Sequence, residues 1–310
     1  MNQLRVGFMA GGGDRRQIER LEALPIDSLW TGGHIASRNA GPDAMSSLIR
    51  LATLTERVRV GTSILLLPLY PPAIVAKMVG EADRMTGGRV TLGVGIGGEY
   101  VQEFSACQVP VSERGKRTDE AIPLIRSLWS GTEVTSTGRF YPMENVKLHP
   151  PPVQPGGPPI AVAGRKTPAM RRAALLGDGW MPYLFSPERY ANSVQTITAL
   201  ANEAGRSLES FEWFAFLFVN VNPDGDAARE EGTAFLGGNY NQDFRAMLDR
   251  VAVTGTPAEV VHRLQAFLDA GARHLVFTLA TRADAEPIRR RLLEEVLPAL
   301  TVPEAASPLR

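Results

Sequence analysis

Segments with the pattern of buried β-strands alternate with segments of helical periodicity along the whole chain of 310 residues. The strand-like segments are short, apolar and rich in β-branched residues, which is typical of strands buried on both faces. They lie at residues 4–9, 28–31, 59–64, 90–94, 160–163, 180–183, 211–221 and 274–279. The helical segments lie at residues 15–24, 43–54, 72–85, 118–129, 168–176, 187–204, 226–236, 242–251, 257–270 and 286–300. Eight strands that are each followed by helix, in about 250 to 400 residues, predict an α/β protein with the (β/α)8 TIM-barrel fold.

Two connections are longer than a barrel needs, and they follow the fourth and the seventh predicted strands. The first of them includes residues 131–159, which are rich in proline and glycine and carry a hairpin signal at residues 136–139. A connection of this length in a compact domain usually covers or lines a functional site. We therefore predict one domain over residues 1–310, with insertions after strands four and seven.

The fourth predicted strand runs directly into Gly95, Ile96, Gly97 and Gly98. Backbone without side chains can approach another group closely, and its amides can hold a phosphate. The same glycines would also serve a tight turn or the packing of two elements. In a doubly wound sheet they would be a dinucleotide fingerprint, which belongs after the first strand and opens a helix at once. Here they follow strand four and no helix follows promptly, so the barrel is favoured.

The composition narrows the classes of partner. Lys and Arg together number 33, as do Asp and Glu, so the chain carries no net charge and no footprint for nucleic acid or an anionic membrane. Cys107 is the only cysteine, which excludes a disulfide framework and a cysteine-based metal site. The chain opens with a strand rather than a signal peptide, and its longest apolar run, residues 64–69, is too short to span a bilayer. We expect a cytoplasmic protein that acts on a small molecule.

In a barrel, the carboxyl ends of the strands face the active site. His34 follows the second strand and is either a general acid–base or a loop histidine bonded to the backbone. Glycine-rich backbone ends the fourth strand and recurs at Ala163 and Gly164 after the fifth, so two sets of amides could hold one phosphorylated ligand. Arg165 is either a phosphate partner or a solvated arginine. Neither paired carboxylates nor a cluster with metal-ligand spacing occurs at these ends, so we expect no metal site.

Several short motifs occur together in an order and spacing that identify a family. The chain resembles the bacterial luciferase-like superfamily of flavin- and deazaflavin-dependent oxidoreductases, and the resemblance covers nearly its whole length. Each motif alone is weak, but their joint order is specific. The motifs are VRVGTS (58–63), GRVTLGVGIGG (88–98), ERGKRTDE (113–120), PIAVAG (159–164), GDGW (177–180) and TGTPAEV (254–260).

The resemblance implies a TIM barrel that binds coenzyme F420 or FMN at the carboxyl ends of its strands, and it implies a homodimer. The residues that it assigns to cofactor binding lie after three strands. Ser63 and Ile64 match a bulge that often holds a non-prolyl cis peptide behind the cofactor ring. The other matches are Gly95, Ile96 and Gly97, at the turn beside the cofactor's side chain, and Ala163 and Gly164, at the backbone that holds its phosphate.

The motif at residues 61–64, and a Gly-x-Gly turn without a bulky aromatic after it, resemble the F420-dependent branch more than the oxygen-using branch. We therefore expect an F420-dependent oxidoreductase in which His34 moves a proton. The alternatives are an FMN-dependent luciferase-like monooxygenase and a relative that binds a cofactor without catalysis.

Overall fold

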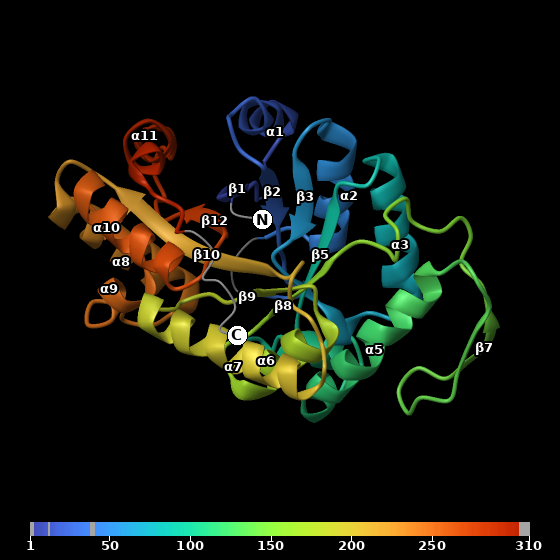
Figure 1. Cartoon of the computed structure of the whole chain (residues 1–310). Helices are drawn as coiled ribbons and strands as arrows, with labels where there is room; N and C mark the ends of the chain where they lie inside the picture. The colour runs from blue at the N-terminus through green and yellow to red at the C-terminus, as the bar shows by residue number, and fades with distance from the viewer. Residues whose placement is uncertain (1–2, 12, 38–40, 304–310) are drawn as a thin grey trace. The chain divides into compact units, whose positions relative to one another are not determined.

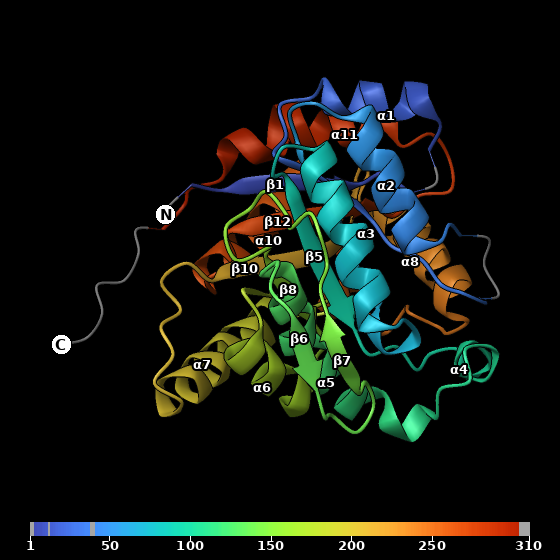
Figure 2. The ribbon, with the colours of Figure 1, turned by 90° about the vertical axis from the view of Figure 1, so that its right-hand side faces the viewer.

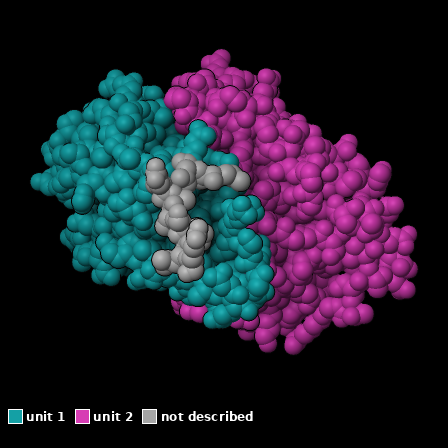
Figure 3. All heavy atoms as spheres, viewed as in Figure 1, with its two compact units in different colours: residues 1–8, 181–310 teal, residues 9–180 magenta. Residues whose placement is uncertain are grey.

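The computed structural model describes residues 3–11, 13–37 and 41–303. The chain divides into two compact units, which Figure 3 colours separately. Unit 1 comprises residues 1–8 and 181–310, and unit 2 comprises residues 9–180. The expectation of a single domain over residues 1–310 stays a prediction.

Unit 2 contains a run of parallel strands in which nearly every residue is buried. The strands are β2 (Ser28–Thr31), β3 (Arg59–Thr62), β4 (Leu65–Leu66), β5 (Val90–Gly95) and β8 (Ile160–Ala163). Strand β3 pairs with β2 on one side and with β5 on the other, and β5 pairs with β8. The short β4 also pairs with β5, at the register Leu65 to Val94. Burial on both faces explains why these strands are continuous apolar segments.

Unit 1 contains a second run of parallel strands. These are β1 (Arg5–Met9), β10 (Glu212–Val221), β11 (Val253–Gly255) and β12 (His274–Leu279). Strand β12 pairs with β1 and with β10, and the far end of β10 pairs with β11. The sequence pattern did not predict β11, which is only three residues long.

Eight strands succeed one another around the sheet in chain order, namely β1, β2, β3, β5, β8, β9 (Gly179–Met181), β10 and β12. Within unit 1, the last of these strands, β12, pairs with the first, β1. This is the strand order of a (β/α)8 TIM barrel (Figure 1), which confirms the predicted fold class. The insertions follow β5 and β10, the fourth and seventh barrel strands, as predicted.

Helices follow the strands in both units. Those of unit 2 are α1 (Arg15–Glu22), α2 (Ala44–Leu54), α3 (Pro72–Met85), α4 (Val101–Ala106), α5 (Arg114–Trp129) and α6 (Thr167–Leu176). Those of unit 1 are α7 (Pro187–Glu203), α8 (Gly225–Tyr240), α9 (Leu248–Val251), α10 (Pro257–Asp269) and α11 (Glu286–Arg291). A capping box formed by Thr256 and Glu259 opens α10, the helix predicted at residues 257–270.

Several helix boundaries differ from the prediction. Helix α8 continues through Gly237 and Gly238, where a break was expected, and ends at Asn241 in the left-handed conformation with φ of 51°. Thr167 lies inside α6, and the N-cap is Lys166, whose side chain makes no capping bond. Helix α5 begins four residues before the predicted start. The last predicted helix, 286–300, is α-helical only as far as Arg291 and ends in π and 3-10 turns.

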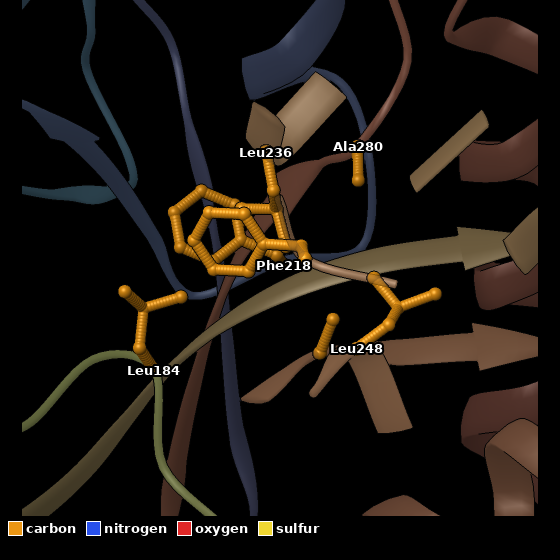
Figure 4. Close-up of a cluster of buried hydrophobic side chains, with 7 residues drawn as sticks. Leu184, Phe218, Leu236, Leu248 and Ala280 are labelled. Carbon is orange, nitrogen blue, oxygen red and sulfur yellow. The ribbon is translucent and has the colours of Figure 1, made fainter. Parts of the chain in front are cut away.

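The continuity of α8 has a tertiary cause. Leu236 belongs to a buried cluster with Leu184, Phe218, Leu248 and Ala280, drawn in Figure 4, and residues on either side of the two glycines also pack against it. Burial of this apolar face stabilises the helix by more than the roughly 1 kcal/mol per residue that glycine costs in a helix.

The long connection after α5 forms the predicted hairpin and is fixed by two carboxylates. Strands β6 (Val134–Ser136) and β7 (Met143–Val146) are antiparallel, and they lie beside α5 in Figure 2. Glu120 of α5 accepts hydrogen bonds from the backbone N–H groups of Phe140 and Tyr141. Asp83 of α3 is fully buried and accepts from the backbone N–H groups of Val153 and Gln154, at 2.8 and 3.0 Å.

We predict that Asp83→Ala lowers the free energy of unfolding by about 2–4 kcal/mol, because two backbone donors lose their acceptor. The measurement is chemical denaturation of the purified protein. Glu81→Ala is the matched control, since Glu81 lies on the same helix in an exposed ion pair with Lys77. This replacement should lower the free energy of unfolding by less than about 1 kcal/mol. Equal losses in the two variants would show that Asp83 does not anchor the connection.

Candidate functional site

All nine predicted site residues lie in unit 2, at the carboxyl ends of its strands. His34 follows β2, and Ser63 and Ile64 lie between β3 and β4. The remaining six residues end two further strands: Gly95, Ile96 and Gly97 at β5, and Ala163, Gly164 and Arg165 at β8. The fold therefore places these residues at the end of the strands where barrels carry their active sites.

The peptide bond between Ser63 and Ile64 is cis, as the family resemblance implied. It interrupts the strand, so that β3 ends at Thr62 and β4 begins at Leu65. The backbone N–H of Ser63 donates to the carbonyl of Thr31 in β2 at 2.5 Å. Ile64 packs against a buried cluster that contains Leu66, and the interruption is thereby held on both sides.

Two glycines of β5 make room for this interruption. A Cβ added to Gly95 would overlap Cδ1 of Ile64, and a Cβ added to Gly93 would overlap the carbonyl oxygen of Thr62. Packing between neighbouring strands therefore suffices to explain why both positions are glycine. Direct contact of Gly95 with a cofactor stays a prediction.

Gly97 and Gly98 turn the chain away from β5 through a conformation that favours glycine. Their φ angles are 62° and 116°. A Cβ on Gly98 would lie 3.2 Å from Nε of Arg114, a buried nitrogen without a hydrogen-bond partner among the described residues. The turn thus presents peptide groups rather than side chains, with a guanidinium beside it.

His34 is paired with a carboxylate that the sequence did not reveal. Its Nδ1 lies 3.1 Å from both carboxylate oxygens of Glu103 in α4. Glu103 is fully buried, whereas one third (33%) of the His34 side chain is exposed. The rings of Tyr100 and His34 are perpendicular to each other, with a centroid distance of 4.9 Å and an interplanar angle of 89°. The histidine therefore has the partner of a general acid–base and is not a loop histidine bonded only to backbone.

Glu103 escaped prediction because nothing in the sequence marks α4. Residues 99–111 show no helical periodicity and lie outside every predicted helix, yet Val101–Ala106 form a helix. The helix is only six residues long and is held by Phe104, which is fully buried beside Leu66 and Leu69. A local pattern cannot report such tertiary burial.

The end of β8 has the features of a phosphate site. Gly164 has φ of 131°, and its carbonyl accepts a hydrogen bond from Nε1 of Trp180 at 3.0 Å. Arg165 and Lys166 follow at once, and α6 begins without a side-chain cap. Pro168 in the first turn of α6 has no N–H, and the N–H of Ala169 donates to the carbonyl of Lys166. The features that favour an anion here are therefore the two adjacent cations and the positive end of the helix dipole, and with these the residues fit the phosphate of a cofactor.

The groups around Cys107 do not make it a nucleophile. Burial raises the pKa of the Cys107 thiol, and the charge of Glu103 raises it further. Burial and the hydrogen bond to Asp43, at 2.8 Å, raise the pKa of the nearby Tyr70. Both groups therefore stay protonated at neutral pH. Cys107 packs against the cluster of Leu66, Leu69 and Phe104, as a small apolar residue does.

Unit 1 carries a separate polar cluster at its own strand ends. The buried Asn220 donates from Nδ2 to Glu231 at 2.7 Å and to the carbonyl of Ala280 at 3.1 Å. The hydroxyl of Thr281 also donates to Glu231. In the described part of the chain, no three His, Cys, Asp or Glu residues gather closely enough to hold a metal ion. Over the same residues, no helix has the length and apolarity to cross a membrane.

Comparison with known proteins gives a family match over most of the chain. Residues 13–274 match the family described as luciferase-like monooxygenase. An F420-dependent glucose-6-phosphate dehydrogenase of Beutenbergia cavernae is 32% identical, over 91% of each chain. An uncharacterized protein of Mycobacterium tuberculosis is 38% identical over 157 residues, and this match spans only about half of each protein, 51% of this chain and 53% of the other.

Solved structures share the fold. An F420-dependent secondary alcohol dehydrogenase, in complex with an F420–acetone adduct, superposes with a TM-score of 0.84. The superposition covers 96% of this chain and 99% of that one at 23% sequence identity. The fold is therefore that of known (β/α)8 enzymes.

We predict that Gly95→Ala lowers the free energy of unfolding by about 1–3 kcal/mol, because the new methyl group collides with Cδ1 of Ile64. Ile64→Val removes that atom and by itself should cost about 0.5–1.5 kcal/mol. The double variant should lose less free energy of unfolding than the two single losses added together, by about 1 kcal/mol or more. Denaturation of all four proteins measures this coupling, and strictly additive losses would contradict the packing explanation.

Proposed function

Because this chain belongs to the luciferase-like monooxygenase family, we propose that it is an oxidoreductase that uses coenzyme F420. It transfers a hydride between this deazaflavin and a small organic substrate. The observation that carries the proposal is the pair of His34 and the buried Glu103, at 3.1 Å, on the same strand ends as the cis peptide and the phosphate-type site. The names of the Beutenbergia cavernae relative and of the alcohol dehydrogenase support the choice of F420.

Three segments of unit 2 would hold the cofactor. Ser63 and Ile64 would lie behind its ring, and the turn of Gly95, Ile96 and Gly97 would lie beside its side chain. The backbone of Ala163 and Gly164, with the guanidinium of Arg165, would hold its phosphate. When bound, the deazaflavin supplies a centre that accepts or gives two electrons as a hydride.

His34 would move the proton that accompanies the hydride. When a carbon that bears a hydroxyl loses a hydride, its C–O bond becomes a carbonyl and the hydroxyl proton must leave. His34 takes that proton in the oxidative direction and returns it in the reductive direction. Glu103, which is buried beside the ring, stabilises the imidazolium that forms. That the enzyme works as a cytoplasmic homodimer stays a prediction.

Cofactor choice is tested by titration of purified protein with F420 and, separately, with FMN, with binding followed by fluorescence. We expect saturable binding of F420 and much weaker binding of FMN, because the proposed ring site belongs to the F420-dependent branch. Tight binding of FMN without binding of F420 would refute the proposed cofactor.

We predict that His34→Ala lowers kcat by about 10²–10⁴-fold, the usual contribution of a general acid–base, and leaves F420 affinity unchanged. The measurement is steady-state turnover with any alcohol or ketone that a substrate screen identifies. His149→Ala is the control, since His149 is an exposed histidine of the long connection. Full activity of His34→Ala would remove the proton-transfer role.

A further inference from the structure

We propose that Glu103 is a positioning residue that fixes His34 in the tautomer with its proton on Nδ1. Nε2 is then the nitrogen that exchanges a proton with the substrate. The substrate step rests on the proposed function, whereas the tautomer follows from the residues alone.

The two oxygens of Glu103 have different surroundings. Oε1 accepts hydrogen bonds from the backbone N–H groups of Ile35 at 2.6 Å and of Ala36 at 3.1 Å. Nδ1 of His34 lies 3.1 Å from each oxygen, but Oε1 already accepts from two backbone N–H groups. The lone pairs left for the imidazole are therefore those of Oε2. The carboxylate is fully buried, so water does not compete for either oxygen. Its orientation is therefore set by the two backbone donors, and the imidazole meets an oxygen already in place.

Glu103 acts as an acceptor toward the backbone N–H groups of Ile35 and Ala36. Because a carboxylate only accepts hydrogen bonds, we assign the donor role in the contact with His34 to Nδ1. A neutral imidazole carries a single N–H, which leaves Nε2 with a free lone pair. The perpendicular contact with the ring of Tyr100 restricts rotation of the imidazole, and the His34 side chain keeps one third of its surface exposed. The resting histidine is thus a base at Nε2, prepared to accept a hydroxyl proton.

This asymmetry predicts an unusual result for Glu103→Gln. The amide oxygen should take the place of Oε1, because the N–H groups of Ile35 and Ala36 require an acceptor. The amide NH2 then replaces Oε2 and donates to Nδ1 of His34. The neutral ring must carry its proton on Nε2 instead, and the base is lost although the packing is nearly unchanged.

The direct readout is the nitrogen NMR spectrum of protein labelled with ¹⁵N-histidine, recorded without cofactor at mildly alkaline pH. His34 is assigned by comparison with His34→Ala. We expect a pyrrole-type signal for Nδ1 and a pyridine-type signal for Nε2 in the unaltered protein. In Glu103→Gln the two types should exchange, a change that a merely structural role would not produce.

Turnover is the second readout, and Gln102→Ala is the matched control. Nε2 of Gln102 donates to the carbonyl of Ala36 at 3.3 Å, so this variant loosens the same contact between α4 and the loop after β2 without touching His34. We expect Glu103→Gln to lower kcat by about 10²–10⁴-fold with F420 affinity unchanged. Gln102→Ala should keep both the tautomer and the activity.

A proton on Nε2 in the unaltered protein would overturn the proposal, and this result needs no variant to fold. Two results with Glu103→Gln would also overturn it. One is a tautomer that is the same as in the unaltered protein, and the other is an exchanged tautomer together with full turnover. Failure of the unaltered protein to bind F420 would instead refute the proposed function and leave the tautomer assignment standing.

Discussion

The hydrogen bonds of one buried carboxylate organise the candidate site. Glu103 joins α4 to the loop after β2 through the backbone of Ile35 and Ala36, and the same group faces the imidazole of His34. A buried charge is tolerated only when it is fully bonded, so the loop and the helix must adopt these positions together. The geometry of His34, the residue proposed to transfer the proton, is thus a product of folding and does not depend on a bound ligand.

The glycines at the end of β5 serve packing and backbone conformation, in addition to the cofactor contact that the sequence indicates. Gly95 is required by Ile64, whose side chain occupies the space where a Cβ would lie. Gly97 and Gly98 are required by their positive φ angles. Each glycine therefore has a sufficient conformational or packing reason, and the proposed contact with a cofactor comes in addition. The phosphate-type features lie elsewhere, at Gly164 and the start of α6.

The sequence sufficed for the fold because the strand signal is strong. Continuous apolar segments such as β8 and β12 are predicted at their observed bounds, and their alternation with helices fixes the barrel class. The cis peptide at Ser63 followed from family resemblance alone, since no propensity reports it. Glu103 could not be predicted, because it lies on a helix of six residues that exists through the burial of Phe104. For the same reason, tertiary packing in unit 1 carries α8 through two glycines that local propensity treats as a stop.

The double duty of Glu103 has an evolutionary consequence. Two selective pressures act on one side chain, since the backbone of the loop needs an acceptor even where no proton is moved. In a lineage that abandons the chemistry, His34 is free to change while the acid is retained for folding. Loss of the acid would therefore affect the fold as well as the proposed chemistry, whereas loss of the histidine would affect the proposed chemistry alone.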